Sequence, residues 1–398
     1  MTLFNSVERA PSDPVFGLNE QFAADTRPNK VNLSIGVYAD ENGKLPLLRC
    51  VQAAERALAE HLAPRAYLPM DGFRHYGAEV QKLLFGAGSE PVASGRVVTL
   101  QALGGTGALR LAADFLKTMG LADRALTSDP TWVNHHALFA RAGFAVGRYR
   151  YSSQQAQGID FDGMLADLGA TGAGTVVVLH ACCHNPTGYD LDDAQWDRVV
   201  DVLRQRQLIP VLDLAYQGFG NGLAQDRAAL DKLARAGVSF LVANSFSKNF
   251  SLYGERVGAL SVVCANAEEA GRVLSQLKVT VRTNYSNPPT HGAAVVTHIL
   301  RDPQLHALWE QELAGMRERV RTMRQKLVDG LVAAGARQDM GFMLRQLGMF
   351  SYSGLSTTQM HQLRSAHAVY GLDSGRLCVA ALNEHNIDYV CNAIAQVL

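Results

Sequence analysis

A single lysine, Lys248, lies among apolar and hydroxyl-bearing neighbours in the stretch from Asn244 to Gly258. Short apolar runs flank this stretch and are typical of buried strands. Partial burial would lower the pKa of the lysine and favour the neutral amine, which attacks carbonyl carbon. A lysine in a surface loop is the common alternative for so short a pattern.

Ser245, Ser247 and Arg256 surround this lysine in the sequence. Serine hydroxyls and a forked, charge-assisted arginine contact are suited to holding a phosphate group. An amine nucleophile beside a phosphate site indicates pyridoxal phosphate as a covalently held cofactor.

A glycine-rich turn, Gly104-Gly105-Thr106-Gly107, follows another apolar strand and precedes a predicted helix. Glycines allow the backbone to approach a ligand, and a helix N-terminus offers free N–H groups to an anion. The turn matches neither the dinucleotide-binding nor the P-loop pattern. It is therefore either a second part of the phosphate site or only a turn.

Polar side chains end other predicted strands. Asp213 ends an otherwise apolar strand, with Tyr216 just beyond it. A buried carboxylate needs a cation, such as a protonated pyridine nitrogen, unless it caps a helix or binds backbone N–H groups. Asn185, in a turn, places an amide at a strand end. Trp132 is either a core residue or a plane that lies over a bound ring.

Two arginines in apolar surroundings, Arg282 and Arg376, are candidates for carboxylate recognition, because the planar guanidinium matches two oxygens. Either could instead form a surface ion pair. The run from His180 to His184 contains two adjacent cysteines, but side chains adjacent on extended backbone point to opposite sides. Because we also found no second Cys/His cluster in the sequence, we expect no zinc site here.

The composition excludes several classes of protein. The 398 residues include 37 Lys plus Arg and 37 Asp plus Glu, so the net charge is zero and predicts no nucleic-acid partner. We identify neither a signal peptide nor an apolar segment near the ~20 residues of a membrane helix. Six scattered cysteines do not form a disulfide framework. We expect a reduced, soluble, cytoplasmic protein with no membrane partner.

The elements that must position these side chains alternate between short apolar strands and amphipathic helices. This alternation predicts an α/β fold with a mostly parallel central sheet that has helices on both faces, and ligands bind beyond the carboxyl ends of such strands. Strands are expected at Val31–Tyr38, Val97–Leu103, Ala125–Ser128, Thr175–Ala181, Ile209–Leu214, Phe240–Ala243 and Val257–Cys264. Helices are expected at Val51–His61, Ala108–Met119, Asp193–Arg206 and Ala228–Ala236.

After Pro303 the pattern changes to one long charged helix, Leu305–Val332, and then to two short strand and helix pairs. We therefore predict that residues 1–45 join a smaller α/β domain formed by residues 311–398, and that residues 46–310 form the large domain. The expected pairs are Met349–Ser353 with Thr357–Ala366 and Leu377–Ala381 with Ile387–Val397.

Taken together, the motifs resemble the fold type I pyridoxal phosphate aminotransferases, in particular the class I aspartate and aromatic amino acid aminotransferases. The resemblance runs from Asp13-Pro14 to Val397. Its motifs, in order, are Gly105-Thr106-Gly107-Ala-Leu, Cys-Cys-His-Asn185-Pro-Thr-Gly, Asp213-Leu-Ala-Tyr216-Gln-Gly-Phe, Ser-Phe-Ser-Lys248-Asn, Leu-Tyr-Gly-Glu-Arg256-Val-Gly, Asn284-Tyr-Ser-Asn-Pro-Pro and Gly-Met-Phe-Ser-Tyr352.

The resemblance implies a role for each matching residue. Lys248 would carry the cofactor and shuttle protons, and Asp213 would pair with the ring nitrogen. His135 and His180 would lie behind Asp213, Tyr216 and Asn185 would bind the phenolic oxygen, and Trp132 would cover the ring. The implied phosphate contacts are Gly105, Thr106, Ser245, Ser247, Arg256 and the neighbouring subunit's Tyr67.

The resemblance also implies how substrate is bound. Arg376 would bind the substrate α-carboxylate with help from the Gly36 backbone, and Trp132 and Asn185 would also line the substrate site. Arg282 of a neighbouring subunit would meet a side-chain carboxylate, so a homodimer with shared sites is expected.

The motifs are more similar to the bacterial aromatic (tyrosine) branch, which predicts transfer of the amino group of aromatic and dicarboxylic amino acids to 2-oxoglutarate by a ping-pong route. A strict aspartate aminotransferase is the alternative, and a non-catalytic regulatory module a remote one. Ala381 stands where the family pattern has glycine, and its methyl group is expected to trim the pocket near Arg376.

Overall fold

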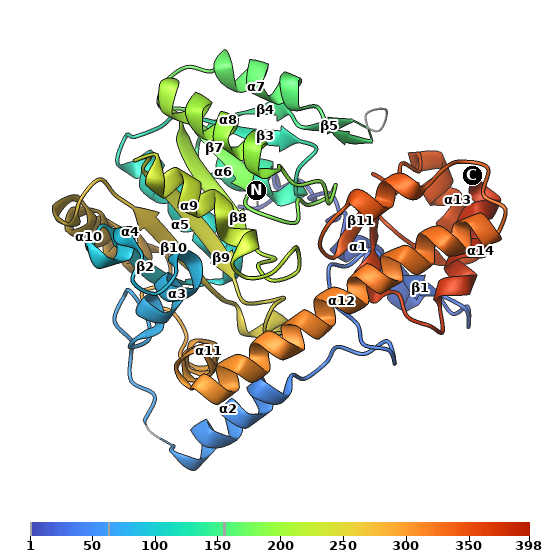
Figure 1. The fold of residues 1–398 in the computed structure, drawn as a ribbon, viewed down its shortest axis with the longest axis horizontal. Coiled ribbons are helices and arrows are strands. Elements are labelled where there is room, and N and C mark those ends of the chain that lie inside the picture. Colours follow the sequence, from blue (N-terminus) through green and yellow to red (C-terminus); the bar gives the residue numbers. More distant parts are fainter. Residues whose placement is uncertain (1, 63, 154–156) are drawn as a thin grey trace.

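A computed structural model describes residues 2–62, 64–153 and 157–398 of the chain. Figure 1 shows a large part built around one sheet and a smaller part that contains the C-terminus. The sheet has seven strands, in the order β2 (Val97–Leu103), β10 (Val257–Val263), β9 (Phe240–Ser245), β8 (Ile209–Leu214), β7 (Val176–His180), β3 (Arg124–Asp129) and β4 (Ala145–Arg150).

The sheet is mostly parallel, as the sequence predicted, but β10 runs antiparallel to both neighbours, β2 and β9. Gly258 of β10 pairs with Ser245 of β9. The connection from β9 to β10 contains only a short 3₁₀ turn, Tyr253–Glu255, because antiparallel neighbours need no crossover helix. This connection places Lys248 and Arg256 beyond the end of β9.

Helices cover both faces of the sheet because its inner strands are apolar on both sides. Val211 of β8 packs into one buried cluster, whereas Leu212 and Leu214 pack into another on the opposite face. The first face carries α5 (Gly104–Thr118), α6 (Val133–Arg141) and α10 (Ala267–Asn284). The second carries α3 (Tyr76–Phe85), α7 (Phe161–Gly169), α8 (Asp193–Gln205), α9 (Ala228–Arg235) and α11 (His291–Arg301).

Helix α12 (Pro303–Ala333) links the two parts of the molecule (Figure 1). It begins where Asp302 accepts hydrogen bonds from the backbone N–H groups of Gln304 and Leu305, which satisfies donors at the helix N-terminus. Near this end the fully buried Trp309 stacks on Phe250, with ring centroids 4.5 Å apart. The beginning of α12 is thereby packed against the Lys248 connection.

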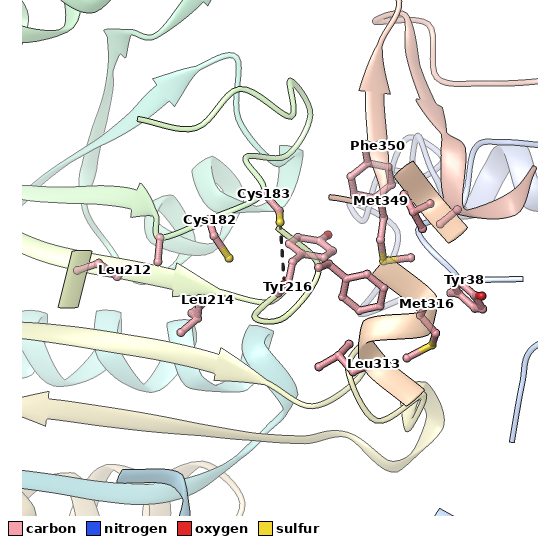
Figure 2. Close-up of a cluster of buried hydrophobic side chains, with 14 of the residues drawn as sticks. Tyr38, Cys182, Cys183, Leu212, Leu214, Tyr216, Leu313, Met316, Met349 and Phe350 are labelled. Carbon is pink, nitrogen blue, oxygen red and sulfur yellow. Dashed lines mark hydrogen bonds between the residues drawn. The ribbon is translucent and has the colours of Figure 1, made fainter. Parts of the chain in front are cut away.

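A shared apolar cluster joins α12 to both parts of the protein, as Figure 2 shows. Leu313 and Met316 of α12 lie between side chains of the large part and those of the smaller part. The large part contributes Cys182, Cys183, Leu212, Leu214 and Tyr216, and the other side contributes Tyr38, Met349 and Phe350. Burial of these side chains fixes the smaller part against the strand ends.

The smaller part combines both ends of the chain. Strand β1 (Val31–Asn32) pairs in parallel with β12 (Val369–Tyr370), and β11 (Phe350–Tyr352) pairs antiparallel with β13 (Arg376–Cys378). Around them lie α1 (Phe16–Ala24), α13 (Thr357–His367) and α14 (Ile387–Val397). The pairing of β1 with β12 supports the predicted grouping of residues 1–45 with residues 311–398, and the exact domain limits stay a prediction.

Two predicted strands were too long. The strand expected at Val31–Tyr38 ends at Asn32, because the Asn32 side chain accepts hydrogen bonds from the N–H and hydroxyl of Ser34 and turns the chain. The strand expected at Leu377–Ala381 ends at Cys378 and continues as a 3₁₀ turn. The edge strand β4 was missed because most of its side chains are not buried, which weakens the apolar pattern.

The other elements are short or lie outside the sheet. They are α2 (Arg49–Glu60), α4 (Glu90–Ala93), β5 (Ser152–Ser153) and β6 (Gly158–Ile159). In the described part of the chain, no helix has both the length and the apolar character to cross a membrane.

Candidate active site

Lys248 is largely buried beyond the end of β9, and its Nζ lies 5.1 Å from the centre of the Tyr216 ring. The pKa of this amine is lowered to about 8: burial lowers it most, the negative charge of Asp213 opposes that shift, and the positive charges of Arg256 and Arg376 add to it. A substantial fraction of the amine is therefore neutral just above physiological pH, the form required of a nucleophile.

An anion site lies beside the lysine. Ser245 Oγ donates to Ser247 Oγ at 3.1 Å, and a guanidinium nitrogen of Arg256 donates to the same Ser247 Oγ at 3.4 Å. The N-terminus of α5 faces this group, since a Cβ placed on Gly105 would lie 3.3 Å from Ser245 Cβ. No side chain caps that helix end, so its N–H groups, including that of the exposed Thr106, are available to an anion.

Asp213 is buried within β8, and its Oδ2 lies 2.9 Å from His135 Nε2. Burial alone would raise the pKa of Asp213, but the hydrogen bond with His135 and the charge of Lys248 lower it overall. The carboxylate therefore stays ionised at neutral pH. On the other ring nitrogen, His135 Nδ1 lies 2.8 Å from Thr131 Oγ1, which orients the imidazole.

His180 lies beside this pair, with its ring centre 5.0 Å from that of His135 and 4.3 Å from that of His184. Burial, followed by the neighbouring imidazoles, lowers the pKa of His180 well below its ordinary value. Neither ring nitrogen has a hydrogen-bond partner within the described residues, so His180 offers an unused polar edge next to Asp213. The implied position of His135 and His180 behind Asp213 agrees with this arrangement.

Arg376 is buried at the start of β13 on the opposite side of the site. Its guanidinium donates to Asn185 Oδ1 at 3.2 Å and to the Ser34 carbonyl at 2.5 Å, and it lies 4.1 Å from the centre of the Phe350 ring. No acid in the described ranges pairs with it, and its Nε is without a partner. A buried guanidinium held in this way is suited to a carboxylate ligand.

Gly36 and Tyr216 both contact the Phe350 ring. A Cβ on Gly36 would lie 2.7 Å from Phe350, so only glycine fits there without a shift of the ring. The Tyr216 and Phe350 rings meet edge to face at 5.8 Å, and burial raises the pKa of Tyr216, which keeps its hydroxyl protonated. Sequence analysis assigned no role to Ser34 or Phe350, although Phe350 lies in the motif Gly-Met-Phe-Ser-Tyr352, because a backbone carbonyl and an apolar ring do not by themselves indicate an arginine contact.

Trp132 meets His135 edge to face, with ring centres 5.3 Å apart. Together with Asn185 and Arg376 it borders a cavity of about 420 Å³, which Lys248 and Asp213 do not line. The cavity lies on the Arg376 side of the site, and the implied placement of Trp132 over a ring stays a prediction. Ala381 packs against the main apolar cluster and is not a lining residue of this cavity, so its expected effect on the pocket also stays a prediction.

Two predicted site residues lie away from this group. Tyr67 is 92% exposed, and Arg282 is exposed near the end of α10, where it donates to Ser286 Oγ. Neither position contradicts the resemblance, which assigns both residues to the site of a neighbouring subunit.

The prediction that the side chains of Cys182 and Cys183 point to opposite sides was wrong. Cys183 has a left-handed φ of +51°, so the backbone is not extended, and both sulfurs lie within 4.8 Å of a carboxylate oxygen of Asp226. That carboxylate already accepts hydrogen bonds from three backbone N–H groups, those of Gly218, Gly220 and Asn221. The proximity of Cys182, Cys183 and Asp226 is therefore explained by the turn that these backbone hydrogen bonds hold.

The family model for aminotransferase class I and II matches residues 28–394. The chain belongs to this family. It is 56% identical to an aspartate aminotransferase of Pseudomonas aeruginosa and 49% identical to an aromatic-amino-acid aminotransferase of Escherichia coli, in both cases over all of each chain. The crystal structure of an aromatic-amino-acid aminotransferase from Burkholderia pseudomallei, covalently bound to pyridoxal phosphate, matches with a TM-score of 0.98 and 57% identity over both whole chains. The resemblance inferred from the motifs is confirmed.

The lowered pKa of Lys248 predicts how the cofactor-free protein reacts with pyridoxal phosphate. The rate of covalent attachment, followed by absorbance, should rise with pH and level off above about 8, because the neutral amine then predominates. Lys248→Ala should abolish attachment, whereas Lys232→Ala, which removes a surface amine paired with Asp193 and Asp197, should not. A midpoint near the ordinary value of 10.5 would contradict the burial argument.

Asp213 is predicted to supply the anion that balances a cation in the site. Asp213→Ala should cost roughly 3–5 kcal/mol of transition-state stabilisation, because it leaves a buried charge without its partner. Such a loss corresponds to about two to four decades in kcat. Steady-state kinetics should show it, and Asp201→Ala, which removes an exposed carboxylate paired with Arg204, should leave kcat unchanged. A near-normal kcat in Asp213→Ala would remove this residue from the mechanism.

Proposed function

We propose that the protein is a pyridoxal phosphate-dependent aminotransferase that transfers the amino group of aromatic and dicarboxylic L-amino acids to 2-oxoglutarate. The observation that carries this proposal is the largely buried amine of Lys248 beside groups suited to an anion and beside the Asp213 carboxylate, with the Arg376 guanidinium on the opposite side of the site. The names of the relatives support both substrate classes.

The residues present fit pyridoxal phosphate. The serine hydroxyls, Arg256 and the uncapped end of α5 form an anion site of the kind that a phosphate needs. Asp213 would hold the ring nitrogen, and Asn185 and Tyr216 the phenolic oxygen, while Lys248 would carry the aldehyde carbon. When bound, this cofactor supplies a ring that takes up the negative charge left on substrate Cα.

The chain's own groups would do the remaining work. Arg376 would bind the substrate carboxylate through its two terminal nitrogens, assisted by Asn185 and the chain near Gly36. Lys248 Nζ would take a proton from substrate Cα and deliver it to the cofactor carbon that had carried the aldehyde, a role that its lowered pKa favours. His135 would keep Asp213 oriented and ionised throughout. A non-catalytic regulatory module would not need this complete set of groups.

We propose further that the protein forms a homodimer with shared active sites. Thr106 and Arg256 leave the anion site open to solvent in one chain, and Tyr67 and Arg282 are exposed. Exposed apolar side chains precede and follow Tyr67 in the sequence, and burial of these in a dimer would stabilise it. They are Leu45, Leu47, Leu62 and Met70. The six cysteines are all free and buried, which supports a reducing, cytoplasmic location.

Arg282 should separate the two substrate classes. An aspartate substrate brings a carboxylate into the pocket, and removing its buried partner typically costs ~2–5 kcal/mol. Arg282→Leu should therefore lower kcat/KM for aspartate by roughly 30- to 5,000-fold, while kcat/KM for phenylalanine should fall by less than about tenfold or rise. If the protein is instead a strict aspartate aminotransferase, the parent enzyme should show little turnover of phenylalanine.

The control for this prediction is Arg272→Leu, which removes an exposed arginine on the same helix that pairs with Glu268. It should leave both substrates unaffected. Equal losses for aspartate and phenylalanine in Arg282→Leu would mean that Arg282 supports the fold or the interface.

Shared sites should be visible in mixed dimers. Lys248→Ala subunits should be inactive on aspartate and Arg282→Leu subunits strongly impaired, yet their heterodimer should contain one intact site and regain about half of the parent activity per dimer. Mixing Lys248→Ala with Arg376→Ala should restore little, because both residues serve one site within the same chain. Confirmed heterodimers without any complementation in the first mixture would contradict a shared site.

A further inference from the structure

The turn that carries Asn185 is held by a carboxylate that the mechanism above does not use. Asp190 Oδ2 accepts the backbone N–H of Cys183 at 2.6 Å, and its Oδ1 accepts the backbone N–H of His184 at 2.8 Å. These two residues directly precede Asn185, whose side chain contacts Arg376. One carboxylate therefore binds two consecutive N–H groups of the segment that aims the Asn185 amide.

The backbone at this point needs such a restraint. Cys183 has a φ of +51°, a conformation that non-glycine residues rarely adopt and that surrounding contacts must stabilise. The imidazole of His184 is held by Ser128 and Thr187, at 2.9 and 2.8 Å, so the side chain of the turn is fixed separately from its backbone. Asp190 supplies the backbone restraint.

We propose that Asp190 is a positioning residue for Asn185, which it holds in the orientation required by both the cofactor and Arg376. The inference rests on the proposed function, because it concerns the same site. Only a carboxylate side chain offers two acceptor oxygens in this geometry. The amide of asparagine would accept one N–H and turn a donor toward the other.

The surroundings of Asp190 indicate that its ionised carboxylate does not stabilise the folded protein. The pKa of Asp190 is raised to about 6: burial raises it most, the two backbone N–H groups oppose that shift, and the negative charge of Asp226 adds to it. The other titratable groups near it are Tyr151, Cys182 and Cys183, all neutral at pH 7, and His184, whose pKa burial lowers well below its ordinary value. Among the described residues, no cation forms an ion pair with Asp190.

The test is Asp190→Asn in the holoenzyme. We expect kcat/KM for aspartate to fall roughly 10- to 100-fold, because a reacting group is displaced. The pH midpoint of the bound cofactor's absorbance should rise, since a weakened amide donor no longer favours the ionised phenolic oxygen. The Tm at pH 8 should stay within about 3 °C of the parent, because a lost hydrogen bond is offset by the removal of an unpaired charge.

Two further variants separate positioning from simple support of the fold. If Asp190 acts through Asn185, the double variant Asp190→Asn/Asn185→Ala should be no slower than Asn185→Ala alone. Asp190→Glu keeps the charge but moves the carboxylate, and it should raise the pH midpoint of the cofactor absorbance as Asp190→Asn does. Asp192→Asn, two residues away at the exposed N-cap of α8, should change neither turnover nor absorbance.

Several outcomes would overturn the inference. They are an unchanged midpoint and turnover in Asp190→Asn, losses that multiply in the double variant, or a large fall in Tm that accompanies loss of cofactor. A parent protein that does not transaminate would overturn the proposed function and this inference with it. An active parent with a normal Asp190→Asn variant would overturn the inference alone.

Discussion

The site depends on one electrostatic constraint, which is that the Lys248 amine is withdrawn from water without being locked into an ion pair. Burial and the charges of Arg256 and Arg376 favour the neutral amine, whereas the Asp213 carboxylate favours the charged one. The pKa of about 8 is the balance of these effects. Asp213 can take part without capturing the proton because His135 already holds one of its oxygens.

The fold maintains this balance by bringing the ends of several strands to one edge of the sheet. The strands β7, β8 and β9 end next to one another and deliver His180, Asp213 and the Lys248 connection. The other half of the site comes from the smaller part, where Arg376 reaches back to Asn185. The apolar cluster around α12 in Figure 2 fixes these two halves against each other, so apolar packing sets the distance between them.

Much of this arrangement could be predicted from the sequence, because its signals are local. Lys248 and Asn185 follow apolar strands and Asp213 lies near the end of one, and strand ends in parallel sheets meet at one edge. The antiparallel direction of β10 could not be predicted, since it depends on the connection. The left-handed Cys183 was missed because the carboxylate that stabilises it, that of Asp190, follows seven residues later and forms no recognised turn pattern with it. The contacts that orient Arg376 escaped prediction because Ser34 acts through its backbone.

The most direct test of the central claim is the half-reaction without an acceptor. Purified protein reconstituted with pyridoxal phosphate should be mixed with excess aspartate, and the cofactor absorbance recorded without 2-oxoglutarate. We expect complete conversion to the amine form of the cofactor, together with one oxo acid per site, followed by return of the original spectrum when 2-oxoglutarate is added. A spectrum that does not change with aspartate, phenylalanine or tyrosine would contradict it.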